Sequence, residues 1–334
     1  MGVIFNIKLL YCSTHRIMTG KDTNNFKDRT MNFISPPILQ KGDAVGIVAP
    51  ARKVSREEIA VSITMFESWG LKVVLGKNLF GELNQFSGTD SERAADFQSM
   101  IGNPQVKAIV CARGGYGSVR ILNHLDLRSL QREPKWVVGY SDITVFHGIL
   151  NSWYMVESLH GIMPINFPAD GKPNISTESL RSVLFGETPT YNAQAHPFNR
   201  YGIASGKLIG GNLSILYSLS GSDADMITEG KILFIEDLDE YLYHIDRMMM
   251  NLKRSGKLRG IAGLVVGGMT DMNDNTIPYG KTALEIIRET VEEYQYPVCF
   301  GFPAGHQKEN VALIMGRMAT LKVDEKGTSL EFYQ

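Results

Sequence analysis

A serine stands between an apolar run and a helical pattern in the stretch Trp136-Val-Val-Gly-Tyr-Ser141-Asp142-Ile-Thr144. Residues 135–138 are predicted to form a buried strand, and residues 143–154 have the apolar spacing of a helix. Ser141 is therefore expected in a tight strand-to-helix turn, where unpaired N–H groups at a helix N-terminus stabilise an oxyanion. This is the arrangement of a nucleophile elbow. The alternative is that Ser141 or Asp142 caps the helix, a role that both residue types fill well.

Two further polar residues follow apolar runs that are predicted to be strands. Glu236 follows residues 231–235, and His306 follows residues 297–300 after a loop rich in glycine and proline. Serine chemistry requires a hydroxyl nucleophile, an imidazole that takes its proton and a carboxylate that holds the imidazole tautomer. Ser141, His306 and Glu236 are the candidates for these roles. Two plainer interpretations stay open: Glu236 as one member of the solvated acidic run 236–240, and His306 as a loop histidine satisfied by backbone.

Six other histidines compete with His306 for the role of base. His147 and His160 lie nearest to Ser141 in the sequence, but the helical pattern directs His147 away from the turn. The others lack a flanking strand end or fall in the N-terminal segment; they are His15, His124, His196 and His244.

The stretch Arg113-Gly-Gly-Tyr-Gly117 is predicted to lie beside the Ser141 turn, because it too follows a strand. Glycine lets backbone approach a substrate closely, so the N–H groups of Gly114 or Gly115 and of Asp142 are candidate oxyanion donors. Arg113 is expected either to bind a substrate carboxylate with its guanidinium fork or to form a structural ion pair. Ile143 stands where an α/β-hydrolase elbow has glycine, so that fold is not indicated.

Strand and helix patterns alternate from Lys41 onward. This βαβα rhythm predicts an α/β fold with a parallel sheet, helices on both faces and a site at the carboxyl ends of the strands. In the first half we expect strands over 44–49, 71–75, 106–111 and 135–138, and helices over 57–69, 90–101, 118–123 and 143–154. In the second half we expect strands over 206–209, 231–235, 263–267 and 297–300, a turn over 210–212, helices over 213–219, 243–255 and 283–294, and a closing antiparallel pair over 313–323 and 329–332.

The length of 334 residues suits two domains. We expect a nucleophile domain over 34–167, a linker over 168–205, where periodicity is lost, and a C-terminal domain over 206–334 that carries the acid and the base. Residues 1–33 are interpreted as an extension outside the fold. Within it, residues 1–30 are expected to be disordered, or to result from a start codon placed upstream of Met31. A weak signal peptide is the alternative.

The composition excludes several classes of partner. A formal net charge of -1 gives no electrostatic reason for binding nucleic acid or an anionic membrane. Three scattered cysteines argue against a disulfide framework and for a reducing, cytoplasmic compartment. No apolar run approaches the roughly 18 residues that cross a bilayer.

No cofactor or metal is indicated by the motifs. The run from Asp271 to Asn275 imitates half of a calcium loop, but Thr276 stands where such a loop has glycine and Thr282 where it has glutamate. HExxH, Cys/His clusters, Walker and Gly-x-Gly-x-x-Gly patterns are absent from the sequence.

Seven motifs in order resemble those of the LD-carboxypeptidases, serine peptidases of murein recycling, over residues 34 to about 325. They are Ser-Pro-Pro-x-Leu-x-Lys-Gly-Asp at 35–43, Val-Ala-Pro-Ala at 48–51, Ala-Arg-Gly-Gly-Tyr-Gly at 112–117, Gly-Tyr-Ser-Asp-Ile-Thr at 139–144, Gly-Gly-Asn-Leu at 210–213, Glu-Asp at 236–237 and Gly-His at 305–306.

The resemblance implies that Ser141 is the nucleophile, Glu236 the triad carboxylate and His306 the base. It also implies an N-terminal domain of the glutamine-amidotransferase type, a mixed α/β C-terminal domain and a homodimer. The expected reaction is metal-independent release of terminal D-Ala from murein tetrapeptides. The alternatives are a hydrolase of peptidyl-nucleotide antibiotics that uses the same triad, as in microcin immunity, and a non-catalytic ligand-binding module.

Overall fold

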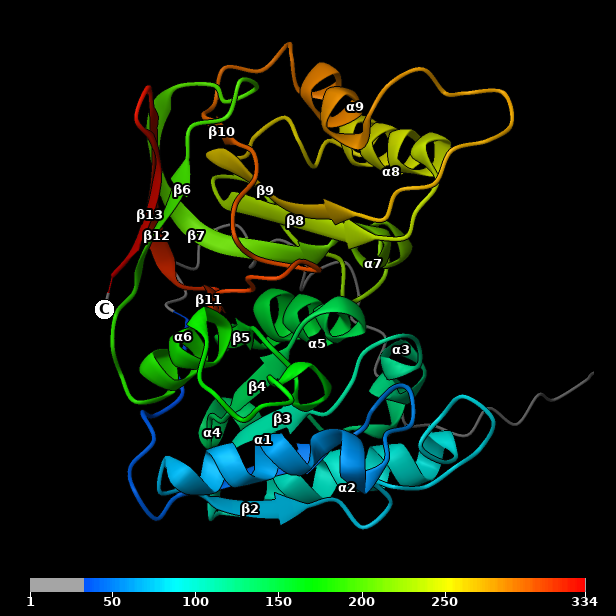
Figure 1. The fold of residues 1–334 in the computed structure, drawn as a ribbon, viewed down its shortest axis with the longest axis vertical. Coiled ribbons are helices and arrows are strands. Elements are labelled where there is room, and N and C mark those ends of the chain that lie inside the picture. The colour runs from blue at the N-terminus through cyan, green and yellow to red at the C-terminus, as the bar shows by residue number, and fades with distance from the viewer. Residues whose placement is uncertain (1–32, 334) are drawn as a thin grey trace, which may run out of the picture. The chain divides into compact units, whose positions relative to one another are not determined.

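The computed structural model describes residues 33–333. The expectations for residues 1–30, including the possible signal peptide, therefore lie outside the described residues. Helices and strands alternate along the described chain and gather around two sheets (Figure 1). The helices are α1 Arg56–Ser68, α2 Asp90–Gly102, α3 Ser118–Ile121, α4 Ser129–Arg132, α5 Thr144–Ile149, α6 Ile175–Leu184, α7 Leu213–Ser218, α8 Leu242–Arg254 and α9 Ala283–Thr290.

The first sheet has the strand order β11-β5-β4-β3-β1-β2. Its members are β1 Ala44–Val48, β2 Lys72–Leu75, β3 Val106–Cys111, β4 Trp136–Gly139, β5 Ser158–His160 and β11 Leu313–Met315. Strands β1 to β4 run parallel, as the sequence predicts. Strand β5, which was not expected, continues the parallel sheet, and β11 pairs antiparallel with β5 at one edge. The expectation that residues 313–323 form one strand of a closing pair was wrong for 313–315, which join this sheet instead.

Helices cover both faces of the first sheet, again as predicted. Successive side chains of β1 point to opposite faces. Val45 and Ile47 pack in the apolar cluster that contains α1, whereas Ala44 and Val48 pack in the cluster that contains α2. Both helices begin at a capping box, which fixes where they start: Ser55 with Glu58 for α1 and Thr89 with Glu92 for α2.

The second sheet has the strand order β10-β9-β8-β7-β12-β13-β6 and is mixed. Its members are β6 Thr190–Gln194, β7 Gly202–Asn212, β8 Ile232–Leu238, β9 Gly263–Thr270, β10 Val298–Cys299, β12 Met318–Asp324 and β13 Gly327–Phe332. Strands β7 to β10 run parallel, while β12, β13 and β6 are antiparallel. The fold class expected from the sequence is therefore confirmed.

The turn expected at residues 210–212 was wrong, because β7 continues through it to Asn212. Gly210 and Gly211 have φ values of +124° and +139°, and a Cβ at Gly210 would collide with the carbonyl oxygen of Phe234 on β8. Gly210 therefore permits close pairing with β8, and Gly211 a close approach to Thr144 of α5, rather than a turn. Residues 168–205, expected to be a linker, contain α6, β6 and the start of β7. The domain boundaries themselves stay a prediction.

The core joins the two sheets. One buried cluster includes Val138 and Leu159 of the first sheet together with Phe234 and Leu321 of the second. Helix α5, which follows β4, also packs on β7 (Figure 1). The turn that follows β4 and the end of β7 are consequently brought together from distant parts of the chain. Within the described residues, no helix has the length and apolar character needed to cross a membrane.

Candidate active site

Ser141 lies in the strand-to-helix turn predicted for it. Strand β4 ends at Gly139, and a 3-10 turn, Ser141–Ile143, leads into α5. Ser141 has a φ of 63°, in the left-handed region that non-glycine residues rarely occupy. Such backbone strain is typical of a serine presented at a sharp elbow.

The alternative that Ser141 or Asp142 caps its own helix was wrong. Tyr140 is the N-cap of the 3-10 turn, and no side chain caps it. The Asp142 carboxylate, only 1% exposed, instead accepts a hydrogen bond of 2.8 Å from the backbone N of Ser118, the first residue of α3. Burial raises the pKa of Asp142, while the Ser118 hydrogen bonds and the charge of Arg93 act in the opposite direction. Asp142 thus joins the Ser141 turn to the glycine-rich loop before α3.

That glycine-rich loop contacts Ser141 directly. A Cβ added at Gly114 would lie 2.9 Å from Cβ and 3.1 Å from Oγ of Ser141, so only glycine fits there. Among residues 33–333, the N–H groups of Gly114, Gly115 and Asp142 have no hydrogen-bond acceptor. The structure thus brings the three candidate oxyanion donors and the candidate nucleophile into one small region.

Glu236 and His306 form a close pair. Nδ1 of His306 lies 2.6 Å from Oε2 of Glu236, and the same oxygen accepts a 3.0 Å hydrogen bond from the His306 backbone N. Glu236 is fully buried, and its position differs slightly from the prediction: it lies inside β8 rather than after it. Neither plainer interpretation holds, because Glu236 is not solvated and His306 is not satisfied by backbone alone.

The pair sets the protonation of the imidazole. A carboxylate can only accept, so Nδ1 of His306 donates and Nε2 is left as the basic nitrogen. Burial alone would lower the pKa of His306, but the hydrogen bond and charge of Glu236, with a further contribution from Asp237, raise it above its ordinary value. This is the state in which an imidazole takes a proton readily.

The Tyr140 ring connects the two halves of the site. Its centroid lies 4.7 Å from that of the His306 imidazole, and Tyr140 directly precedes Ser141. Within the described residues no hydrogen bond joins Ser141 to His306. The structure therefore brings the imidazole beside the turn that carries the serine, with the Glu236–His306 pair already formed.

A polar chain fixes the turn against the second sheet. The Asn212 backbone N, at the end of β7, donates to Oγ1 of Thr144 at 2.9 Å, and Nδ2 of Asn212 donates to Oδ1 of Asp237 at 2.8 Å. Burial, and next the charge of Glu236, raise the pKa of Asp237 to about 7. The start of α5 is thereby tied to the residue that follows Glu236.

The two histidines nearest to Ser141 in the sequence are both fully buried. His147 does not point away from the turn as expected: its Nε2 lies 3.0 Å from the carbonyl oxygen of Gly139 and its Nδ1 2.8 Å from Oγ of Ser158. Burial lowers the pKa of His147 to about 4, and that of His160 well below its ordinary value. Both are fully buried, so neither is placed to act on a substrate.

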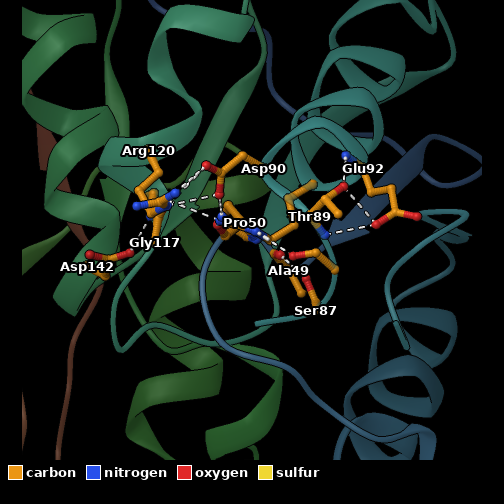
Figure 2. A network of polar contacts seen from close by, with 12 residues as sticks. Ala49, Pro50, Ser87, Thr89, Asp90, Glu92, Gly117, Arg120 and Asp142 are labelled. Carbon is orange, nitrogen blue, oxygen red and sulfur yellow. Dashed lines mark hydrogen bonds and ion pairs between the residues drawn. The ribbon is translucent and has the colours of Figure 1, made fainter. Parts of the chain in front are cut away.

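Sequence reasoning missed a buried arginine beneath the site. Arg93 of α2 is 1% exposed and donates to the carbonyl oxygens of Pro50 and Gly117, the latter at 3.0 Å. Both acceptor residues are labelled in Figure 2. Asp90 pairs with Arg93 and with Arg120 of α3. A pattern could have revealed it, because Arg93 shares the buried face of α2 with Phe97 and Met100 at helical spacing.

Arg113, the candidate for a substrate carboxylate, forms an ion pair in this structure. Its Nη1 lies 3.6 Å from Oε1 of Glu58 and 3.4 Å from the carbonyl oxygen of Lys53. Both side chains of the pair are partly exposed, so the pair itself adds little stability.

Comparison with known proteins shows first which fold this chain shares and then to which family it belongs. The two-sheet α/β fold is that of muramoyltetrapeptide carboxypeptidase from Oxalobacter formigenes, with a TM-score of 0.79, 27% identity, and coverage of 87% of this chain and 99% of that one. The LD-carboxypeptidase N-terminal domain matches residues 45–161 and the LD-carboxypeptidase C-terminal domain matches residues 205–321. The chain belongs to the LD-carboxypeptidase family, and so to the peptidases.

Two curated relatives extend along most of the chain. A probable murein peptide carboxypeptidase of Bacillus subtilis is 35% identical over 310 residues, which cover 90% of this chain and 95% of that protein. The microcin C7 self-immunity protein MccF of Escherichia coli is 27% identical over 331 residues, which cover 87% of this chain and 94% of that protein.

Proposed function

We propose that this protein is a serine carboxypeptidase that hydrolyses the L,D-amide bond of murein tetrapeptides and releases the terminal D-Ala. The observation that carries the proposal is the Glu236–His306 pair beside a strained Ser141 turn, within a chain of the LD-carboxypeptidase family. The relatives named for murein peptides supply the substrate class.

The proposed reaction uses each group at a stated atom. Nε2 of His306 takes the proton of Ser141 Oγ as that oxygen attacks the scissile carbonyl carbon. The carbonyl oxygen becomes an oxyanion that the N–H groups of Gly114 or Gly115 and of Asp142 stabilise. His306 then gives its proton to the leaving nitrogen of D-Ala, and a water molecule, activated by the same imidazole, hydrolyses the acyl-enzyme. Glu236 holds His306 in the tautomer whose Nε2 is basic and stabilises the imidazolium that forms.

A second candidate substrate is a peptidyl-nucleotide, favoured by the likeness to the microcin self-immunity protein. Such a substrate needs an aromatic side chain on which its nucleobase can stack. Trp69 and Trp136 are buried in the core, as expected, but Trp153 is 47% exposed, contrary to expectation. Trp153 lies in the π-helical turn after α5, at the end of that helix remote from Ser141. The murein peptide therefore remains the better-supported substrate.

We further propose that the protein works in the cytoplasm as a homodimer. The free, buried thiols of Cys111 and Cys299 fit a reducing compartment, and the family resemblance supports the dimer. Sedimentation equilibrium of the purified protein tests the second point: a single species of monomer mass would contradict it.

Side-by-side kinetics test the function. The purified protein is given a murein tetrapeptide and a peptidyl-adenylate analogue, with and without EDTA. We expect D-Ala release that survives EDTA, and loss of activity after a serine-reactive phosphonate. A preference for the adenylate of tenfold or more, about 1.4 kcal/mol in the transition state, would contradict the substrate. No turnover of either compound, and no reaction with the phosphonate, would point to a binding module.

A further inference from the structure

Two loops lie side by side at the carboxyl ends of the neighbouring strands β1 and β3. The strands are in register with Val48 opposite Cys111, and the loops continue the contact: the Arg52 backbone N donates to the carbonyl oxygen of Gly114 at 3.4 Å. Arg52 follows β1 in the run Val-Ala-Pro-Ala-Arg, and Gly114 belongs to the candidate oxyanion loop.

The Arg52 side chain covers that oxyanion loop. A Cβ added at Gly115 would lie 2.6 Å from Cγ of Arg52 and would also collide with Cδ. The neighbouring Gly114 makes its own close contact with Ser141. The stem of Arg52 and the candidate nucleophile therefore contact two consecutive residues of the same loop, and Arg52 is solvent-exposed.

Four neighbouring cations are already paired with carboxylates. Lys53 lies 3.0 Å from Glu82, and Arg113 lies 3.6 Å from Glu58. Arg93 and Arg120 both pair with Asp90 (Figure 2). Within residues 33–333, the Arg52 guanidinium has neither an ion pair nor a hydrogen-bond acceptor.

The reacting centre is surrounded by acidic side chains. Glu236, Asp237 and Asp142 are at most 2% exposed. A peptide cut at its last residue brings a free carboxylate to within a few bonds of the scissile carbonyl. Taking a free carboxylate out of water beside these buried carboxyl groups is costly unless a cation pairs with it, so productive binding favours a cation next to the oxyanion loop. A guanidinium fork accepts a carboxylate with two parallel hydrogen bonds.

We propose that Arg52 binds the C-terminal carboxylate of the substrate and thereby makes this site select the last residue of a peptide. The proposal rests on the proposed carboxypeptidase function. It assigns to Arg52 the role that the sequence suggested for Arg113, whose guanidinium lies 3.6 Å from the carboxylate of Glu58.

The test compares two substrates that differ only at the terminal group: the tetrapeptide acid and the same peptide ending in D-alaninamide. The wild-type protein should cleave the acid with a kcat/KM about 100-fold higher, equivalent to about 2.7 kcal/mol. Arg52→Gln keeps a stem over Gly115 but removes the charge. It should lower kcat/KM for the acid by about 100-fold and change that for the amide by less than threefold.

Two further variants sharpen the result. Arg52→Lys keeps the charge without the fork and should retain an intermediate preference for the acid. Lys53→Gln removes the neighbouring, paired cation and should leave the preference at its wild-type value.

The outcomes separate this proposal from the proposed function. If the wild-type protein releases neither D-Ala nor D-alaninamide, the carboxypeptidase function itself fails. If the wild-type protein cleaves acid and amide equally, or if Arg113→Gln rather than Arg52→Gln abolishes the preference, the function stands and the assignment of Arg52 is overturned. The wild-type comparison needs no variant, so equal cleavage of acid and amide overturns the assignment even where a substitution impairs folding.

Discussion

The two sheets contribute to the candidate site in different ways. At the first sheet the site is built from backbone: Ser141 sits at a φ of 63°, and Gly114 approaches it so closely that no Cβ fits between them. At the second sheet it is built from side chains: the fully buried Glu236 accepts two hydrogen bonds from His306. The first half should therefore be sensitive to added volume, and the second half to changes of charge.

The largest effect on activity should come from removing Ser141 of the first half or His306 of the second half. Ser141→Ala and His306→Ala should each lower kcat by roughly 10,000-fold or more. The double variant should lose no more than either single variant, because triad members act as a unit. His124→Ala, at an exposed histidine, is the matched control and should keep wild-type activity. Substantial turnover by folded Ser141→Ala would mean that the two halves do not form one catalytic unit.

The second-largest effect should follow from removing the charge of the buried carboxylate. Glu236→Gln should lower kcat/KM by roughly 1,000-fold, less than loss of the base itself. In the wild-type protein the base is neutral only above the raised pKa of His306, so activity should fall on the acid side at a pH above 6.5. Without the charge of Glu236, burial is opposed only by the charge of Asp237, so the pKa of His306 falls from its wild-type value and the acid limb should move to lower pH.

A second histidine–glutamate pair and a measurement of the unfolding free energy provide controls for this test. Glu240→Gln removes the carboxylate that lies 2.6 Å from Nδ1 of His244 and should leave the acid limb in place. Because the folded-state pKa of His306 is raised, its protonated form contributes stability that is complete below about pH 6.5. That contribution is lost as the pH rises through the folded-state pKa. Glu236→Gln should remove this pH dependence of the unfolding free energy, measured by urea unfolding at several pH values. An unchanged pH dependence would mean that a group other than His306 titrates.

An added methyl group should damage the first half without changing any charge. Gly114→Ala places a Cβ 2.9 Å from Cβ of Ser141, so either the turn or the oxyanion loop must shift. We expect kcat to fall about 100-fold, as for loss of an oxyanion donor, with destabilisation of about 1–3 kcal/mol. Gly102→Ala, where a Cβ meets nothing within 4 Å, should change neither quantity. Full activity in Gly114→Ala would show that the loop and Ser141 do not need this close approach.

The same contrast explains what the sequence could predict. Ser141, with its flanking strand and helix, is a local pattern of a few residues, and the structure places it as expected. The close approach of Glu236 and His306, by contrast, joins residues 70 positions apart. The residues alone supplied only the two strand ends, and the family resemblance supplied their pairing.

The misses have physical causes of the same kind. Strand β11 is only three residues long, and its partner β5 lies more than 150 positions earlier in the chain, so no local pattern predicts their pairing. The Gly210-Gly211 step has the composition of a turn, but Gly210 serves a close contact with Phe234 of β8 and Gly211 one with Thr144 of α5. Arg93 has the residue type of a surface position. It is buried because Pro50 and Gly117, from two distant loops, accept its hydrogen bonds, and Asp90 of the same helix pairs with its charge.

The smallest effect on activity should come from Arg93, which supports the first half from below without contacting the reacting atoms. Arg93→Met fills similar space but leaves the carbonyl oxygens of Pro50 and Gly117 without their donor. We expect destabilisation of about 2–4 kcal/mol and a fall in kcat of about tenfold, with the acid limb of the pH profile unchanged because His306 and Glu236 lie in the other half. Arg128→Met, at an arginine whose side chain is 76% exposed, should cost less than about 0.5 kcal/mol. If Arg93→Met moved the acid limb to lower pH, as Glu236→Gln is expected to, the two halves of the site would be electrostatically coupled. The division into a first half built from backbone and a second half built from charged side chains would then be wrong.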